Sequence, residues 1–158
     1  MLEINLHIHK RAARMKLIKV AKLMWASPCS AVGLALTAVL LVAGAKARWI
    51  SGALEVTWRH NHARCGKRAR KFPYRGIVFG HVILAVTKEE LRTIGAHERV
   101  HVEQYERWGT LFFFAYGASG LWQFVNRRSP YWHNYFEVQA RERSNENHPS
   151  KRSIASFH

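Results

Sequence analysis

The chain has 158 residues, of which 25 are Lys or Arg and 10 are acidic, so its formal net charge is +15. This length suits a single domain, and two cysteines do not support a disulfide framework. The excess of positive charge favours an anionic partner, which is either a phospholipid surface or a nucleic acid.

The first 48 residues are expected to associate with a membrane. Residues 1–24 form a basic, partly amphipathic segment that suits the anionic surface of a cytoplasmic leaflet. Residues 25–45 carry no charge and are just long enough for a bilayer span, although Pro28 weakens the pattern. We therefore predict a transmembrane or membrane-associated helix over residues 25–48. The expected location is a bacterial inner membrane, and a signal peptide is the second reading.

Two apolar runs rich in β-branched residues predict strands, at residues 53–58 and 75–86, with Gly80 as a kink or bulge in the second. We expect these strands to pair into a small sheet. Residues 59–75 lie between them and are dense in Arg and Lys, which predicts a solvated, phosphate-binding loop. No nucleic-acid-binding motif accompanies this loop, so lipid phosphate is the preferred partner and nucleic acid is not expected.

The next predicted element is a helix from Thr87 to Gly109 that carries the sequence HERVH at residues 97–101. Thr87 and Glu90 read as a capping box, and Gly109 is the expected stop. Positions i and i+4 share one helical face, so both histidines can bind one metal ion while Glu98 addresses a water beside it. Random placement would give about 0.04 such motifs in this chain. The alternative is an amphipathic helix whose histidines face solvent or a carboxylate.

A catalytic zinc site needs a third protein ligand and an open position for water. Every acidic residue in the chain is Glu, so this ligand is Glu, His or Cys. We choose Glu137, which follows a short aromatic run in a second helix-like segment, residues 135–142. The apolar run at residues 111–125 is short for a span, and it predicts a buried or interfacial helix that links the two metal-binding helices.

The motif helix and the later sequence FEVQA at residues 136–140 resemble the gluzincin metallopeptidases. They are most similar to small bacterial members and to the CAAX prenyl endopeptidase-like branch, over residues 76–142 and including the His-x-x-Gln continuation at residues 101–104. The resemblance implies a Zn²⁺ peptidase. It assigns the general base to Glu98 and the metal ligands to His97, His101 and Glu137.

One position departs from the family pattern. Where the family usually has Asp, this chain has Arg141. The resemblance implies that the Asp orients a metal-binding histidine, so either Glu142 replaces it here or the activity is weakened.

Peptide hydrolysis also needs a donor aimed at the oxygen that becomes negatively charged. The sequence does not choose among the candidates for this or for a supporting role near the metal, which are His81, Tyr116, Tyr131, His133 and Tyr135, beside Glu142. An edge strand near the metal can hold an extended substrate. Residues 76–86, and Gly80, His81 and Val82 in particular, are therefore the expected substrate strand, with a purely structural hairpin as the alternative.

We thus expect an α+β fold with a minimal zincin-like domain over residues 50–142: a small sheet or hairpin, the motif helix and a second metal-ligand helix. A membrane-associated helix precedes this domain, and residues 143–158 are an expected disordered tail. The expected function is zinc-dependent hydrolysis of a peptide or protein substrate at an anionic membrane. The alternatives are a non-catalytic membrane-surface protein with a structural metal or none and, ranked last, a nucleic-acid-binding module.

Overall fold

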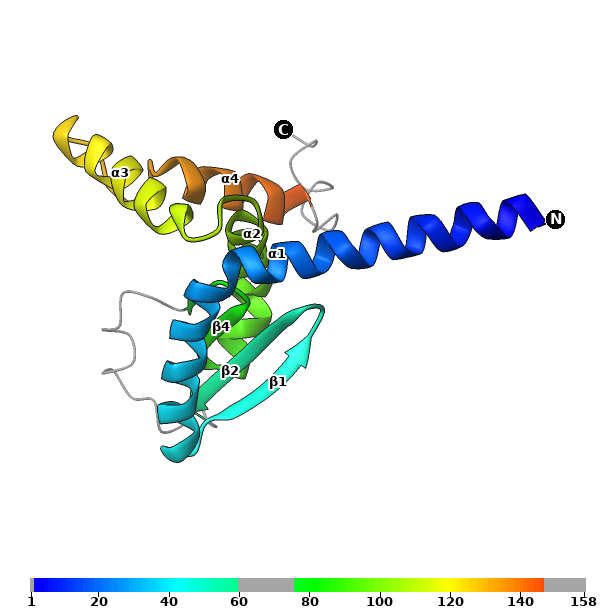
Figure 1. Ribbon diagram of the computed structural model, residues 1–158. Coiled ribbons are helices and arrows are strands. Elements are labelled where there is room, and N and C mark those ends of the chain that lie inside the picture. The colour runs from blue at the N-terminus through cyan, green and yellow to red at the C-terminus, as the bar shows by residue number, and fades with distance from the viewer. Residues whose placement is uncertain (1, 60–75, 147–158) are drawn as a thin grey trace, which may run out of the picture.

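The computed structural model describes residues 2–59 and 76–146 (Figure 1). The described residues form four helices and a four-stranded sheet, which confirms the α+β prediction. In chain order the elements are α1 (Leu2–Val42), β1 (Lys46–Ile50), β2 (Ala53–Arg59), β3 (Gly76–Phe79), β4 (Val82–Thr87), α2 (Lys88–Trp108), α3 (Leu111–Val125) and α4 (Tyr135–Glu146).

Two sequence predictions fall largely outside the described residues. Residues 60–75 contain nearly all of the predicted basic loop, and residues 147–158 contain most of the predicted tail. The part of the tail that is described corrects the prediction, because α4 continues through Glu146 and residues 143–146 are helical rather than disordered.

The sheet is mixed, with the strand order β1-β2-β4-β3. β2 and β4 are parallel, and the two outer strands pair with them antiparallel. The predicted strand at residues 53–58 is confirmed as β2. The prediction of one strand over residues 75–86 is wrong, because the chain reverses at Gly80, whose φ of 58° suits a tight turn.

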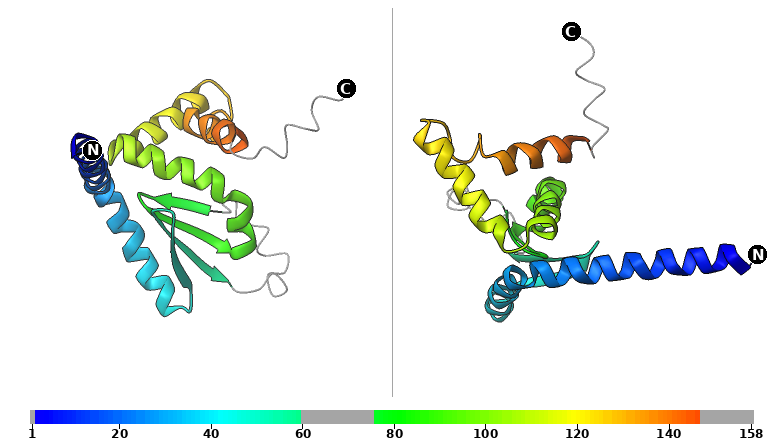
Figure 2. Two further views of the ribbon diagram at one scale, coloured as in Figure 1. Left: turned by 90° about the vertical axis from the view of Figure 1, so that its right-hand side faces the viewer. Right: turned by 45° about the horizontal axis from the view of Figure 1, so that its top comes forward.

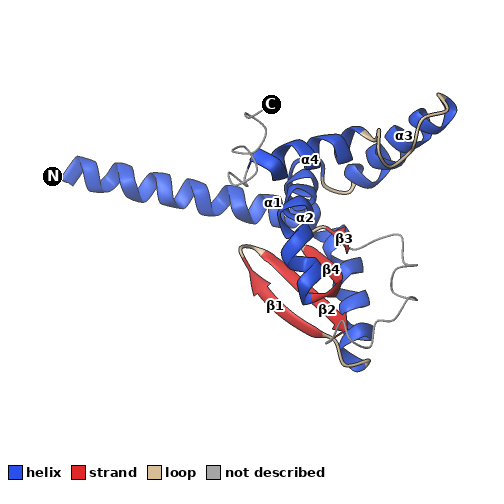
Figure 3. Cartoon of the chain, turned by 180° about the vertical axis from the view of Figure 1, so that it is seen from behind, coloured by secondary structure: helices blue, strands red, loops and turns tan. Residues whose placement is uncertain are grey.

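The two faces of β4 pack against different helices, so the whole strand is buried. Ile83 belongs to a cluster with Leu91 of α2, whereas Leu84 belongs to a cluster with Leu40 of α1. Figure 3 shows α2 in front of the sheet, with the second half of α1 on its far side. A strand that is buried on both faces has a continuous apolar sequence rather than an alternating one. The apolar residues of β3 and β4 therefore form one run in the sequence, and this run hides the turn at Gly80.

Helix α1 is longer than predicted and bends near its middle (Figure 1). It takes in the basic segment and ends at Val42, so the last residues of the predicted membrane helix lie in β1 instead. Pro28 lacks the amide that would bond the Met24 carbonyl, and the Ser27 hydroxyl donates to that carbonyl at 2.7 Å. A missing backbone hydrogen bond of this kind is a common cause of a helix kink.

The second half of α1 packs closely on the sheet through small side chains. Ala26 and Thr37 are buried on this face, and a Cβ added to Gly33 would lie only 2.7 Å from the Cβ of Val82. In the described part of the chain, α1 is also the one helix that is long and apolar enough to cross a membrane, over Ala13–Val42 with a mean hydropathy of 1.8. The same helix is thus both an apolar segment and a layer of the domain.

Helices α3 and α4 form a further layer on the side of α2 that faces away from the sheet (Figure 2, left). Three aromatic rings join the layers: Phe112 of α3 lies 4.4 Å from Tyr105 of α2 and 5.0 Å from Phe136 of α4, measured between ring centroids. Other side chains of α3 are mostly exposed, including Phe113, Phe114 and Trp122. The prediction of a helix at residues 111–125 that links the two metal-binding helices is therefore confirmed, and most of its side chains are exposed rather than buried.

Candidate metal centre

The motif helix begins and ends where the sequence predicts. Thr87 has extended backbone angles, and its hydroxyl accepts a hydrogen bond from the Glu90 amide at 3.1 Å, as an N-cap does. At the other end, Gly109 has a φ of 56° and donates its amide to the Tyr105 carbonyl. A Cβ at Gly109 would lie 2.5 Å from the Trp25 indole, so glycine is needed for space as well as for conformation.

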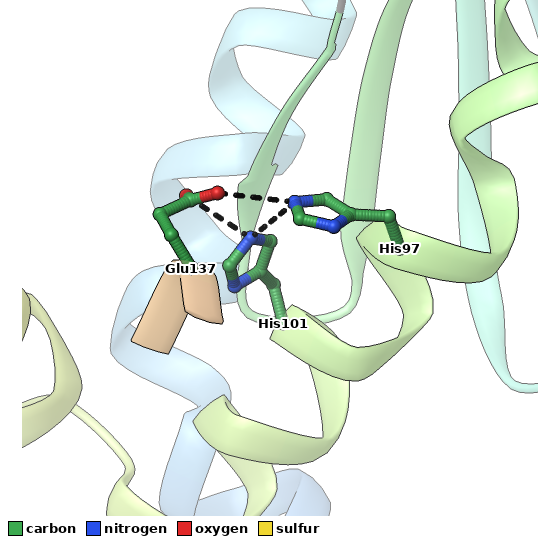
Figure 4. Close-up of side chains that lie close together, drawn as sticks. All are labelled: His97, His101 and Glu137. Atoms are coloured by element: carbon green, nitrogen blue, oxygen red, sulfur yellow. Dashed lines mark hydrogen bonds and ion pairs between the residues drawn. The ribbon is translucent and has the colours of Figure 1, made fainter. Parts of the chain in front are cut away.

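His97, His101 and Glu137 come together as predicted (Figure 4). The Nε2 atoms of the two histidines are 3.1 Å apart. Glu137 lies across both rings, with Oε2 at 3.2 Å from His97 Nε2 and Oε1 at 3.3 Å from His101 Nε2. His101 and Glu137 are buried and His97 is partly exposed, so the group opens towards solvent on the His97 side.

The spacing of these three ligand atoms fits a tetrahedral metal ion. Zinc binds nitrogen and oxygen at about 2.0–2.1 Å, which places the ligand atoms of a tetrahedral site about 3.3–3.4 Å apart. The separation of the two Nε2 atoms, 3.1 Å, is close to this value, and each of them lies 3.2–3.3 Å from a different oxygen of the Glu137 carboxylate. With one ligand atom taken from each residue, the three atoms lie within 4.8 Å of one another. The buried Oε2 atom of Glu137 faces two cationic or protonatable groups, His97 Nε2 at 3.2 Å and Arg141 Nη1 at 3.9 Å. A divalent cation would satisfy that oxygen, so the residues fit the metal that the motif implies.

Gln104 determines which nitrogen of His101 faces the other two ligands. The Gln104 amide nitrogen donates to the Phe136 carbonyl at 3.1 Å and to the Gln139 side chain at 2.9 Å, which leaves Oε1 as the acceptor. His101 Nδ1 lies 2.8 Å from that oxygen and must donate to it. In the neutral imidazole, Nε2 therefore keeps its lone pair and points it at the metal position.

The charges of the group are arranged for cation binding. Burial alone would raise the pKa of Glu137, but hydrogen bonds from His101, His97 and Tyr116 outweigh it and hold the pKa well below its usual value. Glu137 is therefore ionised. Burial would lower the pKa of His101, yet its contacts with Glu137 reverse this effect and raise the pKa above its usual value.

Glu98 is buried beside the triad, against the edge strand β3. A Cβ added to Gly76 of β3 would lie 2.9 Å from Glu98 Oε1 and 2.6 Å from the Ile94 side chain, so glycine leaves the space that this carboxylate occupies. Burial is the main cause that raises the pKa of Glu98, and the Glu137 charge adds to it, while His101 and His97 act in the opposite direction. A carboxyl group with a raised pKa is suited to general acid and base catalysis near neutral pH.

Two of the predicted supporting tyrosines lie at the triad. The Tyr116 hydroxyl donates to Glu137 Oε1 at 2.8 Å and so supports the ligand. Tyr131 interacts with Glu137 as well. Burial, the charge of Glu137 and a hydrogen bond to it raise the pKa of Tyr131 to about 12, and the charge of Glu98 contributes. The Tyr131 hydroxyl is therefore a neutral donor that lies near both carboxylates.

The remaining predicted candidates occupy other places. His81 is buried against Ser30 Oγ and Glu106 Oε1, each at 3.4 Å. Glu106 lies five residues after His101, or about 7.5 Å along the helix axis. His133, Tyr135 and Glu142 are exposed, and no contact between them and the triad occurs within the described residues.

The expected substrate strand is also displaced. Gly80 and His81 form the turn between β3 and β4, and Val82 begins an interior strand with a neighbour on both sides. The edge strand beside Glu98 is β3, Gly76–Phe79. Of the predicted substrate strand, residues 76–86, only residues 76–79 therefore lie at the edge of the sheet.

Sequence reasoning did not find the roles of two polar residues. Gln104 orients His101, the task expected of the missing Asp, and the signal for it was the His-x-x-Gln spacing. Arg141 lies beside the ligand carboxylate, with Nη1 at 3.9 Å from Glu137 Oε2. Its i+4 spacing from Glu137 was the available signal.

No protein-family model matches the chain, and no curated protein or solved structure matches it. The gluzincin resemblance therefore rests on the motif residues themselves. What the structure establishes is a buried group of His97, His101 and Glu137 that could hold a metal ion, in an α+β domain with one long apolar amino-terminal helix.

Proposed function

We propose that the protein is a zinc-dependent peptide hydrolase that works at a membrane surface. The observation that carries the proposal is the group of His97, His101 and Glu137, with one ligand atom from each within 4.8 Å of the others and with Glu98 buried next to it. Two imidazoles and one carboxylate leave a fourth position open, which is the pattern of catalytic rather than structural zinc.

Zn²⁺ bound there would polarise the substrate carbonyl and make water acidic enough to lose a proton near neutral pH. Glu98 is the group that takes this proton while the water oxygen attacks the carbonyl carbon. When the C–N bond breaks, Glu98 returns the proton to the leaving amine. Its raised pKa favours both transfers, and Tyr131 can donate a hydrogen bond to the carbonyl oxygen as its negative charge develops.

The edge of β3 is the proposed place for the substrate backbone. β3 pairs with β4 on one side, and its Gly76 is in contact range of Glu98. An extended peptide that added to this edge would run past the general base with its backbone groups paired. The absence of a side chain at Gly76 would let the scissile bond approach Glu98 closely.

The membrane association is proposed to be interfacial. The second half of α1 packs on a sheet whose neighbouring strands carry Lys46, Arg48 and Glu55, and such charges are costly inside the hydrocarbon core. Lipid therefore cannot surround this half of the helix. We expect α1 and the exposed aromatic face of α3 to lie along the headgroup region, where five exposed basic side chains would meet anionic lipid: Arg11, Arg14, Lys16, Lys19 and Lys22.

The test compares Glu98→Gln with Glu103→Gln in the full chain, purified in detergent. Glu103 lies on the same helix but is exposed and pairs with Arg143. Wild type and both variants should hold one zinc per chain by elemental analysis. Cleavage of a mixed peptide library, followed by mass spectrometry, should fall about 10²–10⁴-fold in Glu98→Gln and stay unchanged in Glu103→Gln.

Two results would contradict the proposal. Cleavage by Glu98→Gln at the wild-type rate would exclude Glu98 as the base. Zinc bound by wild type with no cleavage of any peptide would favour the alternative, a membrane-surface protein with a structural metal.

A further inference from the structure

Arg141 is held in a fixed position beside the metal centre. Its Nη2 atom donates to the Trp132 carbonyl, and its guanidinium carbon lies 5.2 Å from the centre of the Trp132 ring. A hydrogen bond and a cation–π contact from the same residue orient the planar guanidinium group. In this orientation, the other terminal nitrogen of the guanidinium group, Nη1, faces Glu137.

Nη1 has no hydrogen-bond acceptor within the described residues, although it is buried. Its nearest anionic atom, Glu137 Oε2, is 3.9 Å away, which is too far for a hydrogen bond. A buried donor on a charged group is rarely left without a partner in a folded protein. The position is therefore open to an acceptor beyond the described residues, and the charge of Arg141 favours an anion or an oxygen that becomes one.

The family pattern has a carboxylate at this position, and the structure shows why this chain can dispense with it. Gln104 already orients His101 through Nδ1, so position 141 is not needed for that task. The substitution instead places a cation next to a cation-binding group. A positive charge there pairs with Glu137 across one helical turn and would weaken metal binding, whereas it is useful wherever negative charge accumulates.

We propose that Arg141 is the principal oxyanion-binding residue of the site, and this inference rests on the hydrolytic function proposed above. When the water oxygen bonds to the carbonyl carbon, the π electron pair of the C=O bond moves to the carbonyl oxygen. That oxygen then accepts a hydrogen bond from Arg141 Nη1. The proton from the water is on Glu98. As the C–N bond breaks, the electron pair returns to reform C=O and the proton passes to the amine.

The same subsite would take a small carboxylate, which offers a test that does not depend on turnover. The full chain is loaded with Co²⁺ in place of zinc, and acetate is titrated while the visible absorption of the cobalt is recorded. We compare wild type, Arg141→Met, Arg141→Lys and the control Arg143→Met. Arg143 is on the same helix and pairs with Glu103 at 3.1 Å, so the control removes the same charge and one surface ion pair.

We expect acetate to bind at least about tenfold more weakly to Arg141→Met, because a charge-assisted hydrogen bond is lost. Arg141→Lys should recover part of the affinity, and Arg143→Met should behave as wild type. On a peptide that wild type cleaves, kcat for Arg141→Met should fall about 10²–10³-fold with KM nearly unchanged, since the contact forms in the transition state.

The outcomes separate this inference from the proposed function. Equal acetate affinity in wild type and Arg141→Met overturns the anion subsite, whether or not the wild type hydrolyses peptides. A clear dependence on Arg141 with no hydrolysis by wild type supports the subsite and refutes the peptidase. If Arg141→Met fails to bind Co²⁺, Arg141→Lys decides, because a purely structural role would leave its acetate affinity and kcat at wild-type values. Failure of the wild-type chain to bind Co²⁺ overturns both.

Discussion

Replacing Gln104 by Leu should weaken the metal centre without touching a metal ligand. Gln104 is buried and makes three hydrogen bonds, to His101 Nδ1, the Phe136 carbonyl and the Gln139 side chain. Leucine has a similar size and none of these polar atoms. The His101 ring would lose the contact that fixes its tautomer, and loss of such a contact typically costs 10–100-fold in metal affinity, or about 1.4–2.7 kcal/mol.

The same change should also lower the stability of the metal-free protein. His101 Nδ1 would remain buried without a partner, and such a group costs about 1–3 kcal/mol in the free energy of unfolding. Zinc affinity is measured by competition with a chromophoric chelator, and stability by denaturant unfolding of the metal-free chain. Gln139→Ala is the control, because it removes one partner of Gln104 and leaves the bond to His101. Wild-type zinc affinity in Gln104→Leu would refute the reasoning.

Three further outcomes follow from the geometry. Gly76→Ala should retain zinc but lose most hydrolysis, because its Cβ would displace the Glu98 carboxylate; full activity in a peptide cleavage assay would contradict that placement. The pKa of His101 is raised above its usual value of about 6.5, so at about pH 6.5 and below the ring carries a proton that zinc must displace. Chelator competition should therefore show a zinc affinity that falls about tenfold per pH unit below about pH 6.5. A constant zinc affinity down to about pH 5.5 would argue against this coupling. Gly33→Ala should lower the free energy of unfolding by about 1–3 kcal/mol through overpacking, whereas Gly117→Ala, which has open space around it, should be neutral or stabilising; equal effects would show that α1 is not packed so closely.

The metal-binding helices were predictable because their signals are local. The Thr87 cap, the Gly109 stop and the i, i+4 histidines each depend on residues within one turn of one another, and the structure places all of them as expected. The choice of Glu137 rested on the short aromatic run before it in a helix-like segment, and the family resemblance implied the same ligand. The resemblance gave no account of Arg141, whose surroundings come from the segment before α4 and from the metal centre together.

The sheet was harder to predict because its signals are not local. β1 was missed, since every one of its residues is exposed and no apolar alternation marks it. The turn at Gly80 was hidden in an apolar run, because β4 is covered by helices on both faces. The parallel pairing of β2 with β4 joins segments separated by residues 60–81, and no pattern in either strand specifies its neighbour.

The packing of α1 on the sheet has a practical consequence for anyone who trims the chain. Deleting an apolar amino-terminal helix is a routine way to make a soluble protein, yet here that helix supplies one wall of the fold. Its removal would uncover Val56, Val82 and Leu84, which are buried in the intact chain. A shortened protein would carry a bare hydrophobic sheet and should aggregate, so detergent extraction of the whole chain is the sounder route to material for every measurement described above.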